Sequence, residues 1–116
     1  MGTINKVVLV GRLAQDNDLK QVGKDNMPVV NNAIALDGRK KGTDEAIFID
    51  LTAFGKQAEL MAEYTGKGSS VGIEGRLSVD RWEDKEGNPR RKTKVIAERV
   101  TFLGKPKSEQ SDASPF

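Results

Sequence analysis

Strand-like patterning covers most of this chain, and only one segment has the periodicity of a helix. In the segment 46–54, AIFIDLTAF, apolar residues occupy every odd position, and the even positions from 48 onward hold two phenylalanines and two polar residues. Successive side chains of a strand point to opposite faces of a sheet, so the odd positions, Ile47 among them, are predicted to face the core. In the segment 56–64, apolar residues instead recur at helical spacing. Such a chain is restricted to mostly β architectures.

The order of the expected elements indicates a small barrel. Five strands are predicted, at 4–13, 28–36, 46–54, from residue 70 onward and at about 91–103, with the helix between the third and the fourth. This is the order of an OB-fold, an all-β fold with one short helix that forms a five-stranded, partly open Greek-key barrel.

The segments between these elements are rich in turn formers. Residues 19–27, with Gly23, are interpreted as a turn, and Gly66 and Gly68 are expected to end the helix. Residues 84–89, DKEGNP, are predicted to form the tip of a hairpin. The alternation slips partway along the last strand, which predicts a bulge or strong curvature there.

Composition excludes most catalytic sites. The chain has no His and no Cys, which excludes a thiolate or imidazole metal site, a Cys nucleophile and a Ser–His pair. No carboxylate cluster that would hold a metal in a nuclease can be assembled from the sequence. We therefore expect no catalytic residue, no metal and no cofactor. The apolar runs are too short for a membrane span, and the N-terminus lacks the apolar stretch of a signal peptide.

One domain is expected, because 116 residues are close to the commonest domain size. It is predicted to cover residues 1–104. The segment 105–116, KPKSEQSDASPF, has a single large apolar residue and is expected to be a disordered C-terminal tail, since it cannot bury enough surface to offset the entropy of ordering.

Three aromatic residues stand among polar ones. Phe48 and Phe54 share the even face of the segment 46–54, and Trp82, the only tryptophan, lies in a charged hairpin arm. These rings are either covered by a loop or a second subunit, or left open for a flat ligand. Tyr64, near the helix end, suits a core or capping role at least as well.

Basic side chains are interleaved with these rings, although the net charge is only +2. Bases that stack on aromatic rings, while cations follow the phosphates, give single-strand binding with little sequence preference. The acidic residues of the hairpin leave open that its charges form only a solvated arm. The basic residues are Arg39, Lys40, Lys41, Lys56, Lys67, Arg76, Arg81, Arg90, Arg91, Lys92 and Lys94.

Several motifs resemble those of the bacterial-type single-stranded DNA-binding proteins. They are INKVVLVGRL at 4–13, FGKQAE at 54–59, KGS at 67–69, IEGRL at 73–77 and RW at 81–82, and the match covers roughly residues 1–104. The resemblance implies a cytoplasmic OB-fold subunit, usually in a homotetramer, that coats single-stranded DNA in replication, recombination and repair. The location would be the bacterial nucleoid or, for a phage-encoded member, the infected cell.

The resemblance also implies a set of site residues. Phe48, Phe54 and Trp82 match the family's base-stacking positions. The implied phosphate or base contacts are Lys6, Lys56, Lys67, Arg76 and Arg81, with Tyr64 a weaker one. Lys40 stands in a loop where the family often has a further aromatic, which predicts less stacking and more charge contact there. Some members carry basic residues where this chain has Ser78 and Asp80.

The tail is shorter than that of longer members, which end in an acidic tip that docks replication and repair proteins. Asp112, Pro115 and Phe116 are the remaining candidates for such a contact, and a weakened partner site and an unspecialised tail are both compatible with them. Two other functions stay open for the aromatic face: an OB-fold adaptor that contacts protein through it, and a binder of single-stranded RNA.

Overall fold

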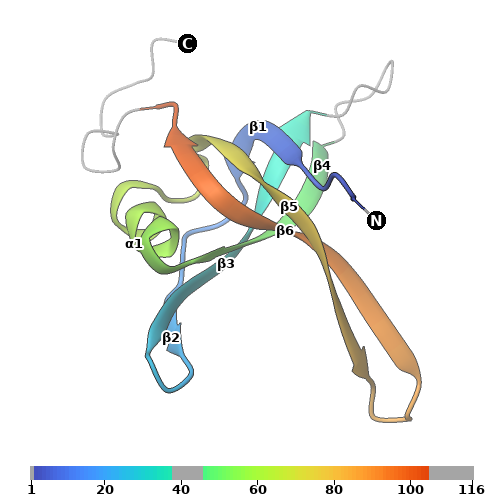
Figure 1. The fold of residues 1–116 in the computed structure, drawn as a ribbon. Coiled ribbons are helices and arrows are strands. Elements are labelled where there is room, and N and C mark those ends of the chain that lie inside the picture. The colour runs from blue at the N-terminus through green and yellow to red at the C-terminus, as the bar shows by residue number, and fades with distance from the viewer. Residues whose placement is uncertain (1, 38–45, 105–116) are drawn as a thin grey trace.

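The computed structural model describes residues 2–37 and 46–104, which form six strands and one helix. Figure 1 shows them as a curled sheet with the helix at one end and a long hairpin that projects away from it. The elements are β1 (Val7–Leu13), β2 (Leu19–Val22), β3 (Met27–Asp37), β4 (Ala46–Phe54), α1 (Gly55–Tyr64), β5 (Ser70–Glu83) and β6 (Pro89–Phe102).

Five of the strands close into a ring. The strand order is β1-β5-β6-β4-β3-β2, and β1 also pairs with β3. The pairing of β1 with β3 joins only Arg12 to Ala35 and Leu13 to Ile34, and the parallel pairing of β4 with β6 runs only from Leu51 to Ala53. The barrel is thus closed at two short seams. The predicted fold, a partly open OB-fold barrel with one short helix, is confirmed.

The expectation of a turn over residues 19–27 is wrong at its start. Leu19–Val22 forms β2, which pairs with β3 outside the ring, and the turn is confined to the residues between the two strands. Gly23 and Asn26 adopt the positive φ angles, 76° and 51°, that this tight connection requires. All four residues of β2 are exposed, so no buried alternation marks this strand in the sequence.

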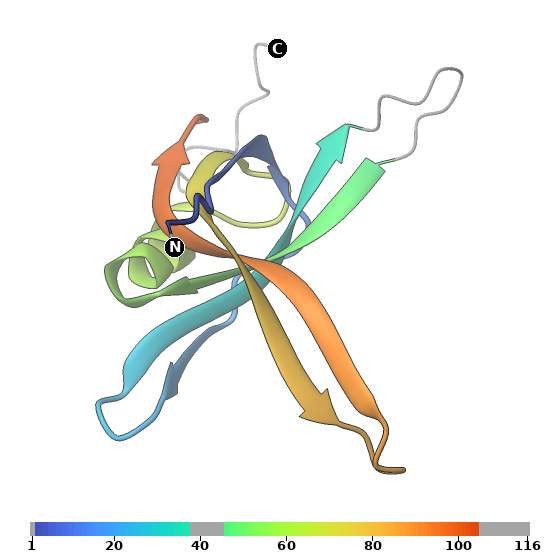
Figure 2. The ribbon, with the colours of Figure 1, turned by 45° about the vertical axis from the view of Figure 1, so that its right-hand side comes forward.

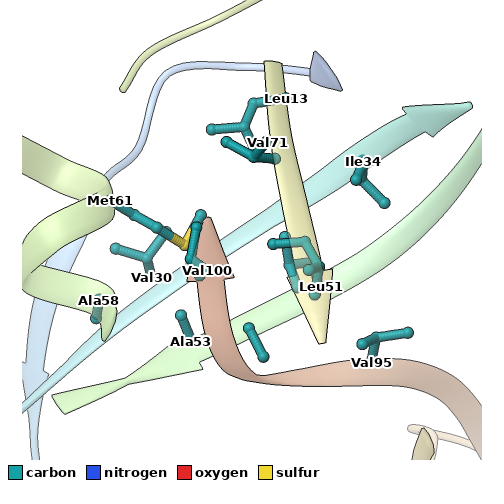
Figure 3. Packing of buried hydrophobic residues seen from close by; sticks show 12 residues of the cluster. Leu13, Val30, Ile34, Leu51, Ala53, Ala58, Met61, Val71, Val95 and Val100 are labelled. Atoms are coloured by element: carbon teal, nitrogen blue, oxygen red, sulfur yellow. The ribbon is translucent and has the colours of Figure 1, made fainter. Parts of the chain in front are cut away.

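The core fills the ring and continues beneath α1 (Figure 3), where Ala58 and Met61 are buried. Ile47, predicted to face the core, is 49% exposed, because β6 covers β4 only from Leu51 onward. The first residues of β4 extend beyond the barrel with β3 (Figure 2). The core cluster consists of Leu13, Val30, Ile34, Leu51, Ala53, Ala58, Met61, Val71, Ile73, Val95, Ala97 and Val100.

The helix ends differently from the expected glycine cap. Its C-cap is Thr65, an extended residue with φ −131°, whose N–H donates to the Met61 carbonyl at 3.0 Å. Asn17, from the segment between β1 and β2, donates through Nδ2 to the Met61 carbonyl at 2.9 Å and to Thr65 Oγ1 at 2.8 Å. Gly68 has a φ of 85° but does not cap the helix. It lies in the loop before β5, where its N–H donates to the Leu13 carbonyl. The Asn17 side chain, from a segment distant in the sequence, therefore completes this helix end.

The last two strands form a long arm with one bulge. Glu74 pairs with Arg99 and Gly75 with Ala97, which leaves Glu98 without a residue opposite it and confirms the predicted irregularity. A Cβ at Gly75 would overlap the Ile96 carbonyl, so the two strands approach closely there. Beyond the bulge the arm leaves the barrel, as both ribbon views show (Figures 1 and 2).

The tip of the arm is the predicted hairpin turn. The Asp84 carboxylate accepts the N–H groups of Glu86 and Asn88, each at 2.9 Å, and the Arg90 Nε donates to it at 3.0 Å. The hydrogen bond from the Asn88 backbone, with support from Arg90 and Glu86, lowers the pKa of Asp84 below its usual value of 3.8. The ionised carboxylate thus holds the turn together.

Candidate nucleic-acid interface

One outer face of the sheet runs without interruption over β3, β4, β6 and β5. In the register of the sheet, Thr52 of β4 pairs with Ile96 of β6, which in turn pairs with Arg76 of β5. Paired residues project to the same side, so every second residue of each strand belongs to this face. We call it the aromatic face. It consists of Val29, Asn31, Ala33, Ala35, Phe48, Asp50, Thr52, Phe54, Arg76, Ser78, Asp80, Trp82, Arg90, Lys92, Lys94 and Ile96.

Three rings are open on this face. Phe48, Phe54 and Trp82 are 63%, 41% and 48% exposed in the described chain. Phe48 and Phe54 lie six residues apart on β4, a distance of about 20 Å along a strand. Between them Thr52 is buried, and its Oγ1 donates to Asn31 Oδ1 at 2.7 Å. The face therefore offers exposed rings at its ends, with a buried hydroxyl at Thr52 and a partly exposed carboxylate at Asp50 between them.

Each of four cations along this face has a carboxylate partner. Lys92 Nζ lies 3.2 Å from Asp50 Oδ2, and Lys94 Nζ lies 2.8 Å from Asp80 Oδ2. Arg76 forms an ion pair with Glu98 at 2.9 Å, and Arg90 forms one with Asp84 at 3.0 Å. From the sequence, Lys92 and Lys94 are expected only as members of the basic set. Their partners are distant in the sequence, and nothing in the local pattern identifies them.

The other predicted contact residues are not part of the aromatic face. Arg81 pairs with Arg91 and so points to the reverse side of the arm from Trp82. Lys56 is exposed in the first turn of α1, close in sequence to Phe54. Lys6 precedes β1 and Lys67 lies between α1 and β5, and both are exposed. The register therefore brings Arg76 to the rings and separates Arg81 from them.

Tyr64 has a packing partner. Its ring centroid is 5.8 Å from that of Phe102, with the planes tilted by 53°, although the residue remains 39% exposed. This contact favours the structural role that the sequence left open for Tyr64. The Lys40 prediction and the predicted tail contacts of Asp112, Pro115 and Phe116 lie outside the described residues.

A shallow cavity of about 510 Å³ surrounds the indole of the arm. It is lined by three successive cross-strand pairs, of which the pair of Trp82 with Arg90 belongs to the aromatic face and the two flanking pairs to the reverse side of the arm. The indole and the Arg90 guanidinium therefore share one side of the arm, which suits a base that stacks on the ring and a phosphate that contacts this arginine. The lining residues are Arg81, Trp82, Glu83, Pro89, Arg90 and Arg91.

The described residues 2–37 and 46–104 contain no group of three or more carboxylates placed to hold a metal ion. Within the same ranges, α1 is far too short and polar to cross a membrane.

Comparison with known proteins identifies relatives along almost the whole described chain. The model of the single-strand binding protein family matches residues 4–103. Single-stranded DNA-binding protein 2 of Clostridium acetobutylicum is 40% identical, over 86% of this chain and 77% of that protein. The single-stranded DNA-binding protein of Clostridium tetani is 39% identical, over 97% and 79%. Single-stranded DNA-binding protein 2 of a Nostoc species is 36% identical, over 98% and 89%.

Proposed function

Because this chain belongs to the single-strand binding protein family, we propose that it binds single-stranded DNA with little sequence preference and protects it during replication, recombination and repair. Members of this family are DNA-binding proteins and not enzymes. In the proposed mechanism, bases stack on Phe48, Phe54 and Trp82 while neighbouring cations contact the phosphates.

The observation that supports this mechanism best is the exposure of three rings on one continuous sheet face. Packing inside the subunit leaves 41% or more of each residue open. Each ring can receive one base, and a base stacked on an aromatic side chain contributes about 1–3 kcal/mol of binding free energy. Every base has a π-face, so this surface accepts many sequences.

The cations have different roles in this mechanism. Lys56, beside Phe54, and Arg76, on the aromatic face, lie where a strand that crosses the rings would pass. Arg81 faces the reverse of the arm, where it would contact a strand that continues around the tip. Lys6 and Lys67 are peripheral contacts in the same mechanism.

The only tryptophan provides the direct test. Titration with oligo-dT should quench the Trp82 emission strongly, and the affinity should fall as the salt concentration rises. A duplex of the same length is the matched control, because its bases are already stacked. Indole emission that does not respond to oligo-dT would contradict the mechanism. Parallel titration with an RNA of matched sequence tests the RNA alternative, since a stacking surface does not by itself exclude the 2′-hydroxyl.

We also propose that the chain assembles into a homotetramer, with β1 at a subunit contact. Between Val7 and Gly11, β1 pairs on one side only, with β5. Val8 and Val10 on this strand are 63% and 65% exposed. An apolar edge strand is a template for pairing with another copy. Mass photometry should show the tetramer, and Val8→Lys with Val10→Lys should reduce its mass. A monomeric unmodified protein would contradict this assembly.

A further inference from the structure

Two lysines of the aromatic face are bound to aspartates of the same face. Lys94 reaches Asp80 on β5 at 2.8 Å, and Lys92 reaches Asp50 on β4 at 3.2 Å. Asp50 lies between Phe48 and Phe54 on β4, and Asp80 precedes Trp82 by two residues on β5. Both carboxylates therefore lie on the surface that bases and phosphates of a bound strand would share.

We propose that Asp50 and Asp80 compete with DNA phosphates for Lys92 and Lys94 and thereby limit the affinity for single-stranded DNA. This inference rests on the proposed function. A phosphate that approaches one of these ammonium groups meets a carboxylate that already neutralises the charge and that repels the phosphate, whether or not the carboxylate is displaced. The two lysines consequently contribute less to binding than their number and position would suggest.

Burial predicts which of the two pairs has the larger effect. The Lys94 side chain is only 19% exposed, whereas that of Lys92 is 56% exposed. Less exposed charges are screened less by salt and solvent, so Asp80 should hold Lys94 more firmly than Asp50 holds Lys92. Replacement of Asp80 is therefore expected to have the larger effect on binding.

A purely structural role is the competing explanation, because the pairs join three strands. In register Asp80 pairs with Lys92, yet its carboxylate contacts Lys94, and Lys92 contacts β4 instead. Ion pairs of this kind could merely hold the arm against the barrel. The salt dependence of binding separates the two roles, because a structural pair would change the melting temperature and not the number of phosphates contacted.

The size of the effect follows from counterion release. For single strands the logarithm of the binding constant falls by about 0.7 per phosphate contact for each tenfold rise in salt. A lysine freed for one further phosphate should steepen the slope by about 0.7. On the same relation, affinity should rise about fivefold at 0.1 M salt and about twofold at 0.4 M.

The experiment measures the affinity for labelled oligo-dT by fluorescence anisotropy, for Asp80→Asn, Asp50→Asn and the unmodified protein. The salt concentration is varied from about 0.1 to about 0.4 M, so that the salt slope can be determined. Glu63→Gln is the matched control, because it removes the same charge from an exposed residue of α1, which is not part of the aromatic face. Asp80→Asn should give the tighter, more salt-dependent binding. Addition of Lys94→Ala should abolish that gain.

Several results would overturn the inference. They are an Asp80→Asn affinity that equals that of Glu63→Gln, an unchanged salt slope, or weaker binding, which would mean that Asp80 positions Lys94 for DNA. If Asp80→Asn does not fold, Asp50→Asn provides the same comparison on an independent pair. An unmodified protein that does not bind oligo-dT would instead refute the proposed function, so the two failures are distinguishable.

Discussion

Replacement of Phe48 by Ala should weaken DNA binding while the protein stays folded. Phe48 is 63% exposed, so only about a third of the residue is in contact with the protein. A fully buried phenylalanine buries about 150–250 Å², so loss of that third, at about 25 cal/mol per Å², costs at most about 2 kcal/mol of unfolding free energy. Loss of one stacked base costs about 1–3 kcal/mol of binding, which is a 5- to 150-fold rise in Kd.

Two variants on the same residue and strand control this experiment. Phe48→Tyr keeps the flat ring and should retain near-native affinity for oligo-dT. Leu51→Ala, three residues along β4, removes a side chain that is 1% exposed and should cost about 2–5 kcal/mol of stability while the folded fraction binds normally.

Affinity is measured by anisotropy of labelled oligo-dT, and stability by chemical denaturation. The reasoning is refuted if Phe48→Ala binds as tightly as the unmodified protein. It is also refuted if this variant loses as much stability as Leu51→Ala, since Phe48 would then belong to the core.

Three further predictions concern the scaffold. Gly75→Ala should lower the melting temperature, because the new Cβ would overlap the Ile96 carbonyl, and a native melting temperature would contradict the close approach at the bulge. Asn32→Ala should lower the free energy of unfolding, measured by denaturant melts, by about 1–3 kcal/mol, because this buried amide donates two hydrogen bonds at 2.8 and 2.9 Å. Unchanged stability would contradict a stabilising role for these hydrogen bonds. The pKa of Asp84 is lowered in the folded state. Its contribution to folding stability is therefore present above the pKa of the unfolded chain and is lost as the pH falls through the pKa of the folded protein. An NMR titration should place the Asp84 midpoint below 3.8, with the Asn88 amide signal moving in step, and a midpoint above 3.8 would disprove the hydrogen-bonded turn.

Local patterns predicted the elements and the faces of most strands. The two-residue period places Phe48 and Phe54 on the same side of β4 whatever the rest of the chain does, because side-chain direction in a strand depends only on position. The same alternation places the Arg81 and Trp82 side chains on opposite faces of β5, although the two residues are adjacent in the sequence. The slipped alternation of the last strand indicated the bulge at Glu98 for the same local reason.

Burial and partnership were decided by the tertiary structure. Ile47 has the pattern of a core residue, but it is exposed because β6 ends its pairing with β4 before reaching it. β2 forms by pairing with β3, and its two apolar residues, Leu19 and Val22, neither alternate along the strand nor are buried. Lys92 meets Asp50 only because the parallel seam brings β6 beside β4. Periodicity is a property of neighbouring residues. Burial and charge pairing depend instead on which distant strand lies alongside, and that arrangement is determined only when the five strands close into the barrel.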